Sequence, residues 1–200
     1  MNKNRITIIV PCRQYEEPAV TLNSLKLQTF QDFKVVVVKD QGKGANWARN
    51  EGFKQCDTEF VLFSDNDLEW KSNALETKVR YLDRLKKPSY CYGRYILGDK
   101  IWGHQEWNPM LLKKMNYIST MGLIRAKDFP GFDESITRLQ DWDLWLTMLE
   151  QGKTGVYCDD LVFMTAIRPG ITYDHNLNPF NTFTAAEEIV KRKHGLLLNQ

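Results

Sequence analysis

The stretch EFVLFSDNDLEW, residues 59–70, determines how the rest of the chain is interpreted. Its apolar first half predicts a buried β-strand over 59–64. The strand ends at Ser64, and two carboxylates, Asp65 and Asp67, follow one residue apart. A plain turn explains these residues, because Asp and Asn tolerate left-handed backbone and bond their own main chain. The neighbouring segments decide between a turn and a site.

Two earlier apolar runs predict strands that share a sheet with this one. RITIIVPC, 5–12, and FKVVVVKD, 33–40, are β-branched runs of strand length. Helical patterns begin near Pro18 and after QGKG, 41–44, so strands and helices alternate at short spacing. This alternation predicts βαβ units with right-handed crossovers. We therefore expect an α/β fold with a central, mostly parallel sheet flanked by helices.

The second half of the chain adds elements without any repeat or linker, so we expect a single domain over residues 1–200. The patterns predict helices over 73–86, 139–152 and 182–195, strands over 89–97, 116–126 and 154–167, and an aromatic-rich loop over 98–109. Asp159 and Asp160 are expected to bend the last strand.

The composition is that of an ordinary globular protein, with 42% hydrophobic and 26% charged residues. A net charge of +2 is smaller than that expected of a protein that grips the backbone of duplex nucleic acid. The four scattered cysteines suit reduced thiols in a cytoplasmic protein. No apolar run approaches the ~20 residues of a transmembrane helix. We therefore expect a cytoplasmic chain without a transmembrane segment, and a lipid-linked substrate stays open.

Polar residues follow each of the first three strands: Arg13, then Asp40, then the pair Asp65 and Asp67. Ligands bind outside the carboxyl ends of the strands in an open parallel sheet. Two adjacent carboxylates repel unless a cation holds both, and Asp-x-Asp offers hard oxygens to Mg²⁺ or Mn²⁺. The sequence has no P-loop, so amides of QGKG and the Lys43 side chain are candidates to bind phosphate. These features predict a metal and phosphate site.

The order of five segments resembles glycosyltransferase family 2, whose members are inverting enzymes with the GT-A fold. The segments are ITIIVPC, LQTFQDFKVVVVKD, GANWARNEG, FVLFSDND and GFDESITRLQDWDLWL, within about residues 5–172. The resemblance implies one GT-A (Rossmann-like) domain, with a nucleotide-binding half over 1–70 and an acceptor-side half over 71–200. It also implies a nucleotide-sugar donor, UDP-linked by default, and Mn²⁺ or Mg²⁺.

On the donor side, the resemblance assigns roles by position. Pro11 to Arg13 would line the base pocket, and Asp40 would bond the base. Asp65 would face the ribose close to the metal, and Asp67 would ligate the metal that bridges the diphosphate. His175 is a further candidate metal ligand, with a solvated loop histidine as the alternative.

On the acceptor side, the resemblance makes Asp141 the catalytic base. Asp143 lies two positions further on, and residues i and i+2 of a helix do not face the same way. Inverting transfer needs one carboxylate to deprotonate the acceptor hydroxyl, an effect typically of 10²–10⁴-fold. The diphosphate must also leave with its charge neutralised, a role for the metal as Lewis acid.

Four positions depart from the family pattern. Lys39 stands where a first Asp is usual, and Arg13 stands where an aromatic ring often stacks on the base. Gln140 replaces the usual Glu beside the base, and Arg168 occupies the place of a metal-ligating His. The Gln-x-x-Arg-Trp signature is missing, so we do not expect polymerising activity.

Two other functions stay open. A sugar nucleotidyltransferase would share the fold, but it would carry glycines around the basic residue after the first strand, and none surrounds Arg13. A catalytically inactive nucleotide- or sugar-binding module would fit Lys39 and Gln140, but it has no need for four site carboxylates. The acceptor is also open: a glycan, a lipid carrier, a protein or a modified nucleic-acid base.

Several further residues carry weaker expectations. Trp142 and Trp145 are expected in the core, whereas Trp102 and Trp107 could either pack or contact a sugar. Arg49 and Asn50 should tie their helix to the sheet. The segment KRKHG, 191–195, reads as a solvated helix end, with a contact to an anionic acceptor as the alternative.

Overall fold

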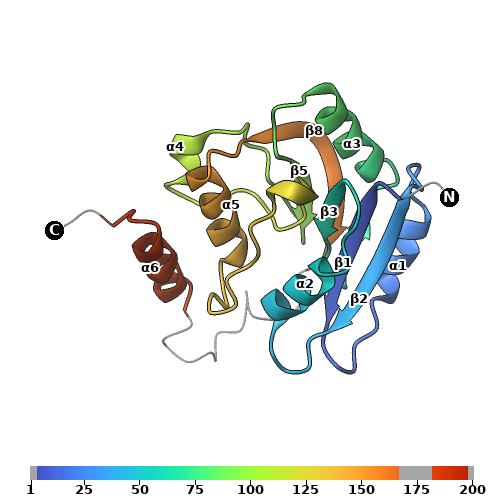
Figure 1. The fold of residues 1–200 in the computed structure, drawn as a ribbon, viewed down its shortest axis with the longest axis horizontal. Coiled ribbons are helices and arrows are strands. Elements are labelled where there is room, and N and C mark those ends of the chain that lie inside the picture. The colour runs from blue at the N-terminus through green and yellow to red at the C-terminus, as the bar shows by residue number, and fades with distance from the viewer. Residues whose placement is uncertain (1–3, 167–181, 198–200) are drawn as a thin grey trace.

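A mixed sheet of eight strands lies at the centre of the computed structural model, which describes residues 4–166 and 182–197 (Figure 1). The strand order is β2-β1-β3-β7-β5-β8-β4, and β6 pairs with β5. The strands are β1 (Ile6–Cys12), β2 (Phe33–Lys39), β3 (Phe60–Phe63), β4 (Glu69–Trp70), β5 (Tyr90–Leu97), β6 (Lys100–Trp102), β7 (Leu123–Arg125) and β8 (Gly155–Thr165). The five longest, β1, β2, β3, β5 and β8, run in one direction, which confirms the predicted α/β class with a mostly parallel sheet.

Helices cover both faces of this sheet, as Figure 1 shows. They are α1 (Ala19–Lys26), α2 (Ala45–Phe53), α3 (Ala74–Arg84), α4 (Pro109–Leu112), α5 (Gln140–Glu150) and α6 (Phe183–Lys193). The side chains of β1 alternate between the two faces. Ile8 enters a core with Leu25 of α1 and Leu75 of α3, whereas Ile9 enters a second core with Trp142 of α5.

Gly52 sets how closely α2 approaches β1. A Cβ at this position would lie 2.4 Å from the Ile9 side chain, which real carbon atoms do not tolerate. The absent side chain therefore lets the α2 backbone pack directly on the strand whose end forms part of the site.

The strand predicted over 116–126 is much shorter than expected, because only Leu123–Arg125 joins the sheet. The preceding residues use their carbonyls differently. The Ile118 carbonyl accepts a hydrogen bond from the Trp145 indole at 3.0 Å, and the Met121 carbonyl accepts one from the buried Lys78 ammonium. Side chains from distant helices thus replace strand pairing over this stretch.

Two short strands were not predicted from the sequence, and one predicted bend is present. The expected loop 98–109 contains β6, which turns back on β5 after the left-handed Gly98. The acidic turn leads directly into β4, which pairs with β8. The prediction of a bend at Asp159 and Asp160 is confirmed, because the β5–β8 register shifts there within a single strand.

No helix in the described part of the chain combines the length and the apolar character that crossing a bilayer requires.

Candidate functional site at the strand ends

The turn after β2 holds Asp40 at the carboxyl end of the sheet. Gln41, Gly42 and Gly44 adopt φ angles of 52°, 76° and 93°, a region that glycine enters without steric cost. The Gly42 N–H donates to the Asp40 carboxylate at 3.1 Å, and the Lys43 N–H donates to the Asp40 carbonyl at 2.8 Å. Asp40 therefore occupies a compact turn with its side chain partly engaged by the backbone.

The end of β1 lies beside this turn. The Asp40 N–H donates to the Cys12 carbonyl at 2.8 Å. Pro11 is buried within β1, and Arg13 is exposed immediately after it. The structure thus brings Pro11, Arg13 and Asp40 to adjacent strand ends, the arrangement that a pocket for a nucleotide base needs.

Two lysines near these strand ends face other groups. The Lys43 ammonium lies 4.5 Å from the centre of the Trp47 ring, a cation–π contact on the first turn of α2. The Lys39 ammonium pairs with the Glu17 carboxylate at 3.0 Å and with the Glu16 carbonyl. The charge of Lys39, which departs from the family pattern, is therefore paired with the loop after β1.

The acidic turn after β3 is held by side chains from two other elements. The Thr21 hydroxyl of α1 lies 2.9 Å from the Asp65 carbonyl and accepts a hydrogen bond from the Leu68 N–H at 2.9 Å. The Trp70 indole donates to the Ser64 hydroxyl at 2.9 Å. Both ends of the turn are fixed, so Asp67 lies partly buried in a defined position between them.

Arg49 joins α2 to the acidic turn. Its guanidinium pairs with the Asp65 carboxylate at 2.8 Å and donates to the Asn46 side chain at 3.0 Å. The Arg49 side chain is only 3% exposed and its Nε has no hydrogen-bond partner within the described residues, while Asp65 remains 41% exposed. The expectation that Arg49 ties its helix to the sheet is confirmed at the loop that ends β3.

Asp141 lies in the first turn of α5, after the left-handed Leu139 (φ 59°). Its carboxylate accepts a hydrogen bond from the Trp142 N–H at 2.9 Å and another from the Asn116 side chain. Burial raises the pKa of the Asp141 carboxyl above its usual range, and these hydrogen bonds and the Arg49 charge oppose that rise. The candidate base thus lies within the electrostatic reach of the cation that binds Asp65.

The two carboxylates of the acidic turn suit a hard cation only in part. Asp65 and Asp67 supply oxygen donors of the type that Mg²⁺ and Mn²⁺ prefer. Among residues 4–166 and 182–197, no three His, Cys, Asp or Glu side chains form a ready metal cluster. The donor set therefore fits an ion that takes its remaining ligands from water and a phosphate. His175 and Arg168 lie outside the described residues.

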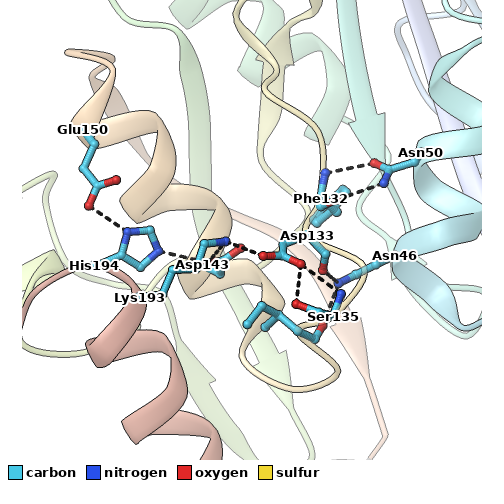
Figure 2. A network of polar contacts seen from close by, with 10 residues as sticks. Asn46, Asn50, Phe132, Asp133, Ser135, Asp143, Glu150, Lys193 and His194 are labelled. Carbon is cyan, nitrogen blue, oxygen red and sulfur yellow. Dashed lines mark hydrogen bonds and ion pairs between the residues drawn. The ribbon is translucent and has the colours of Figure 1, made fainter.

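Sequence reasoning missed residues that act through distant contacts. Asn46 of α2 bonds the loop 131–136, and the expectation that Asn50 ties α2 to the sheet is wrong, because its side chain bonds the same loop (Figure 2). The segment 191–195 is not a solvated helix end, because Lys193 and His194 pair with carboxylates of α5 and of that loop. Their partners lie 44 to 60 residues away in sequence, so no local pattern indicates them.

The aromatic residues divide between packing and exposure. Trp142 and Trp145 are buried, which confirms the core prediction. The Trp107 indole donates to the Tyr90 hydroxyl at 3.0 Å, which supports a packing role for that ring. Trp102, at the end of β6, is 46% exposed.

Comparison with known proteins agrees with this geometry. The family model described as "Glycosyl transferase family 2" matches residues 39–132, which include the turn after β2, α2, the acidic turn and the start of the loop before α5. Over these residues the chain is similar to glycosyltransferase family 2. A curated relative is a β-1,3-glucosyltransferase of Escherichia coli, WfgD, named for UDP-Glc and α-D-GlcNAc-diphosphoundecaprenol, with 25% identity over 133 residues. That match covers 62% of the chain and 52% of WfgD, so the chain spans about half the length of this relative.

Solved structures share the fold. TarS of S. aureus, residues 1–349 in complex with UDP-GlcNAc, superposes with a TM-score of 0.75 at 17% identity, over 94% of this chain and 66% of that TarS fragment. The same TarS fragment in complex with UDP gives a TM-score of 0.68 at 18% identity, over 82% and 61% of the two chains. These superpositions show that the chain has the GT-A fold.

Proposed function

We propose that the chain transfers a sugar from a UDP-sugar to an acceptor hydroxyl, with inversion at the anomeric carbon. The observation that carries this proposal is the position of Arg49 between two carboxylates. On the proposed donor side, Asp65 forms an ion pair with Arg49. On the proposed acceptor side, the Arg49 charge lowers the pKa of Asp141. Two similar proteins, a transferase named for UDP-Glc and TarS in complex with UDP-GlcNAc, support a UDP-sugar as donor.

Asp141 is the proposed general base. It removes the proton from the acceptor hydroxyl while that oxygen bonds to the anomeric carbon. The bond from that carbon to the diphosphate breaks, and UDP leaves with the electron pair. A single displacement of this kind inverts the configuration. A carboxylate with a raised pKa is a stronger base than one with an ordinary pKa, so the environment of Asp141 suits the role.

Asp65 and Asp67 are the residues that would hold a divalent cation, Mn²⁺ or Mg²⁺, with His175 as a further candidate. When bound, such an ion supplies charge neutralisation at the diphosphate. The backbone amides of Gln41 and Gly44 are candidates for further contacts to the phosphates, because those of Gly42 and Lys43 already donate to Asp40.

A sugar carried on a lipid diphosphate is the acceptor that we favour. WfgD is named for such a substrate. In this chain, the segment from α4 to Asn116 exposes Met110 (65%) and Met115 (50%) together with two lysines. Asn116 itself hydrogen-bonds to Asp141. The apolar and basic side chains therefore lie next in sequence to a hydrogen-bond partner of the proposed base. Such a surface suits an anionic lipid carrier.

The test is a turnover assay with UDP-glucose and UDP-GlcNAc as donors and a GlcNAc-diphospholipid as acceptor, with Mn²⁺ or EDTA. We expect UDP release, and a β-linked product from the α-linked donor by proton NMR. Asp141→Asn should reduce kcat by about 10²–10⁴-fold without weakening UDP binding. An α-linked product, or full turnover by Asp141→Asn, would contradict the mechanism. UDP binding without any turnover would indicate an inactive binding module.

A further inference from the structure

The end of α6 contacts the side of α5 that carries Asp143 and Glu150 (Figure 2). The Asp143 carboxylate, 4% exposed, lies 2.7 Å from the Lys193 ammonium and 2.9 Å from His194 Nε2. His194 Nδ1 lies 2.8 Å from the Glu150 carboxylate, so one histidine spans two turns of α5. A buried carboxylate is thus shared by two side chains of one helix end.

Asp141 and Asp143 point to different sides of α5, since two helical steps rotate a side chain by about 200°. Asp141 accepts a hydrogen bond from Asn116 and interacts electrostatically with Arg49, whereas Asp143 forms an ion pair with Lys193 of α6. The first turn of α5 begins at Leu139, which provides no side-chain cap. The orientation of this first turn of α5 therefore depends on contacts from other elements. Among these contacts, the end of α6 provides the ion pairs to Asp143.

Lys193 also reaches the donor side through a second carboxylate. Its ammonium lies 2.8 Å from Asp133 Oδ2, in the loop that precedes α5. The Asp133 carbonyl accepts a hydrogen bond from the Asn46 side chain at 2.9 Å, and Asn46 in turn accepts one from Arg49. Figure 2 shows this path from α6 through the loop to α2. One ammonium therefore connects the α5 turn with the Arg49 end of the site.

We propose that Lys193, acting through Asp143 and Asp133, is a positioning residue that holds Asp141 in register with Arg49 and the donor. This inference rests on the proposed transfer reaction. The physical reason is distance: a shift of about 1 Å in a reacting group costs up to about 10²-fold in rate. Removing the Lys193 charge leaves Asp143 buried beside a single cation, and the α5 turn is then free to move.

His194 contributes to the same grip in its charged form. The charged groups around it are Asp143, Glu150 and Lys193. Burial lowers the pKa of His194, but hydrogen bonds to the two carboxylates outweigh that effect and raise the pKa above its ordinary value. A protonated imidazole donates from both nitrogens, which matches its position between two acceptors. Lys193 nevertheless carries the link to Asp133, so it is the residue to test.

The test compares Lys193→Gln with Arg192→Gln, its neighbour on α6. Arg192 is 72% exposed and pairs with Glu188 one turn away, so its substitution removes the same charge from outside the network. We expect Lys193→Gln to lower kcat for UDP release about tenfold with the UDP dissociation constant unchanged within twofold. Arg192→Gln should leave both values at wild type, and Lys193→Arg should restore most of the rate. Thermal melts establish that each variant is folded.

Three outcomes would overturn the inference. Lys193→Gln could retain the wild-type kcat, or it could weaken UDP binding as much as it lowers kcat. Equal losses in Lys193→Gln and Arg192→Gln would show a general effect of charge. Each of these contradicts positioning while wild-type turnover still supports the proposed reaction. Absence of wild-type turnover would overturn the proposed function and this inference together.

Discussion

At the scale of single residues, the electrostatics of the site depend on Arg49. It is buried, its charge pairs with Asp65, and the same charge acts on the more deeply placed Asp141. Asp65, by contrast, remains partly exposed to water. Two carboxylates near one cation therefore have different environments, which is how a site separates a group that binds from a group that accepts a proton.

The pH dependence of turnover follows from the environment of Asp141. Its raised pKa keeps the proton on the carboxyl to higher pH than an ordinary Asp, for which the pKa is about 3.9. Activity that needs the carboxylate is complete above the raised pKa and is lost as the pH falls through it. We therefore expect the acid limb of kcat/KM to lie above pH 4, since ionisation of an ordinary Asp is centred near about 3.9.

A matched pair of asparagine variants tests the cause. Asn116→Ala removes a hydrogen bond that lowers the pKa of Asp141, so it should move the acid limb to higher pH. Asn23→Ala, on the exposed side of α1, should leave the limb where it is. Profiles that coincide for wild type and Asn116→Ala would exclude Asp141 as the group that titrates.

At the scale of elements, the close packing of α2 on β1 carries a prediction of its own. Gly52→Ala places a methyl group 2.4 Å from the Ile9 side chain inside a closed core. We expect a loss of about 1–3 kcal/mol in the free energy of unfolding, measured by urea denaturation. Glu51→Ala, whose side chain pairs with Lys54 at the surface, should change it by less than about 0.5 kcal/mol. Equal stabilities of the two variants would show that α2 can shift without cost.

The elements that could be predicted from sequence are those with a strong local period. The apolar runs of β1, β2 and β3 are correctly placed because β-branched and aromatic residues favour strands, although only β1 and β3 are buried along their whole length. The prediction of a strand over 116–126 was mostly wrong, because the side chains of Trp145 and Lys78 donate hydrogen bonds to backbone carbonyls in its first part. No local sequence pattern indicates that these distant side chains will replace the strand pairing.

The candidate site divides in the same way. Asp40, Asp65 and Asp67 follow strands directly, so the parallel order of the sheet gathers them at one edge. Asp141 needed the family resemblance, because helix periodicity alone does not say which face points to the donor. The grip of Lys193 on Asp143 needed the structure, since 50 positions separate the two residues in sequence.

At the scale of the whole molecule, α2 joins the first half of the chain to the loop that precedes α5. The Asn46 amide donates to the carbonyls of Asp133 and Ile136 at 2.9 and 2.8 Å. The Asn50 side-chain amide donates to the Phe132 carbonyl at 2.9 Å, and the Phe132 N–H donates to the Asn50 side-chain oxygen at 2.9 Å. The loop that leads to the candidate base is therefore anchored on the helix that carries Arg49.

Asn46→Ala should loosen this junction. It leaves two carbonyls of the loop without their donor and removes the acceptor of Arg49, so we expect a loss of about 1–3 kcal/mol in the free energy of unfolding. Urea denaturation measures the change, and Asn23→Ala again provides an exposed asparagine as the control. A loss no larger than that of the control would show that the two halves are held together by other contacts.

The most direct test of the central claim is calorimetric titration of UDP into the protein with Mn²⁺ and with EDTA, for wild type and Asp67→Asn. A donor site at the strand ends predicts UDP binding that tightens with Mn²⁺ in the wild type. In Asp67→Asn, that gain should disappear while weak UDP binding persists through the base pocket. Failure of the wild type to bind UDP with or without Mn²⁺ would contradict the account, because the acidic turn would then be a turn and nothing more.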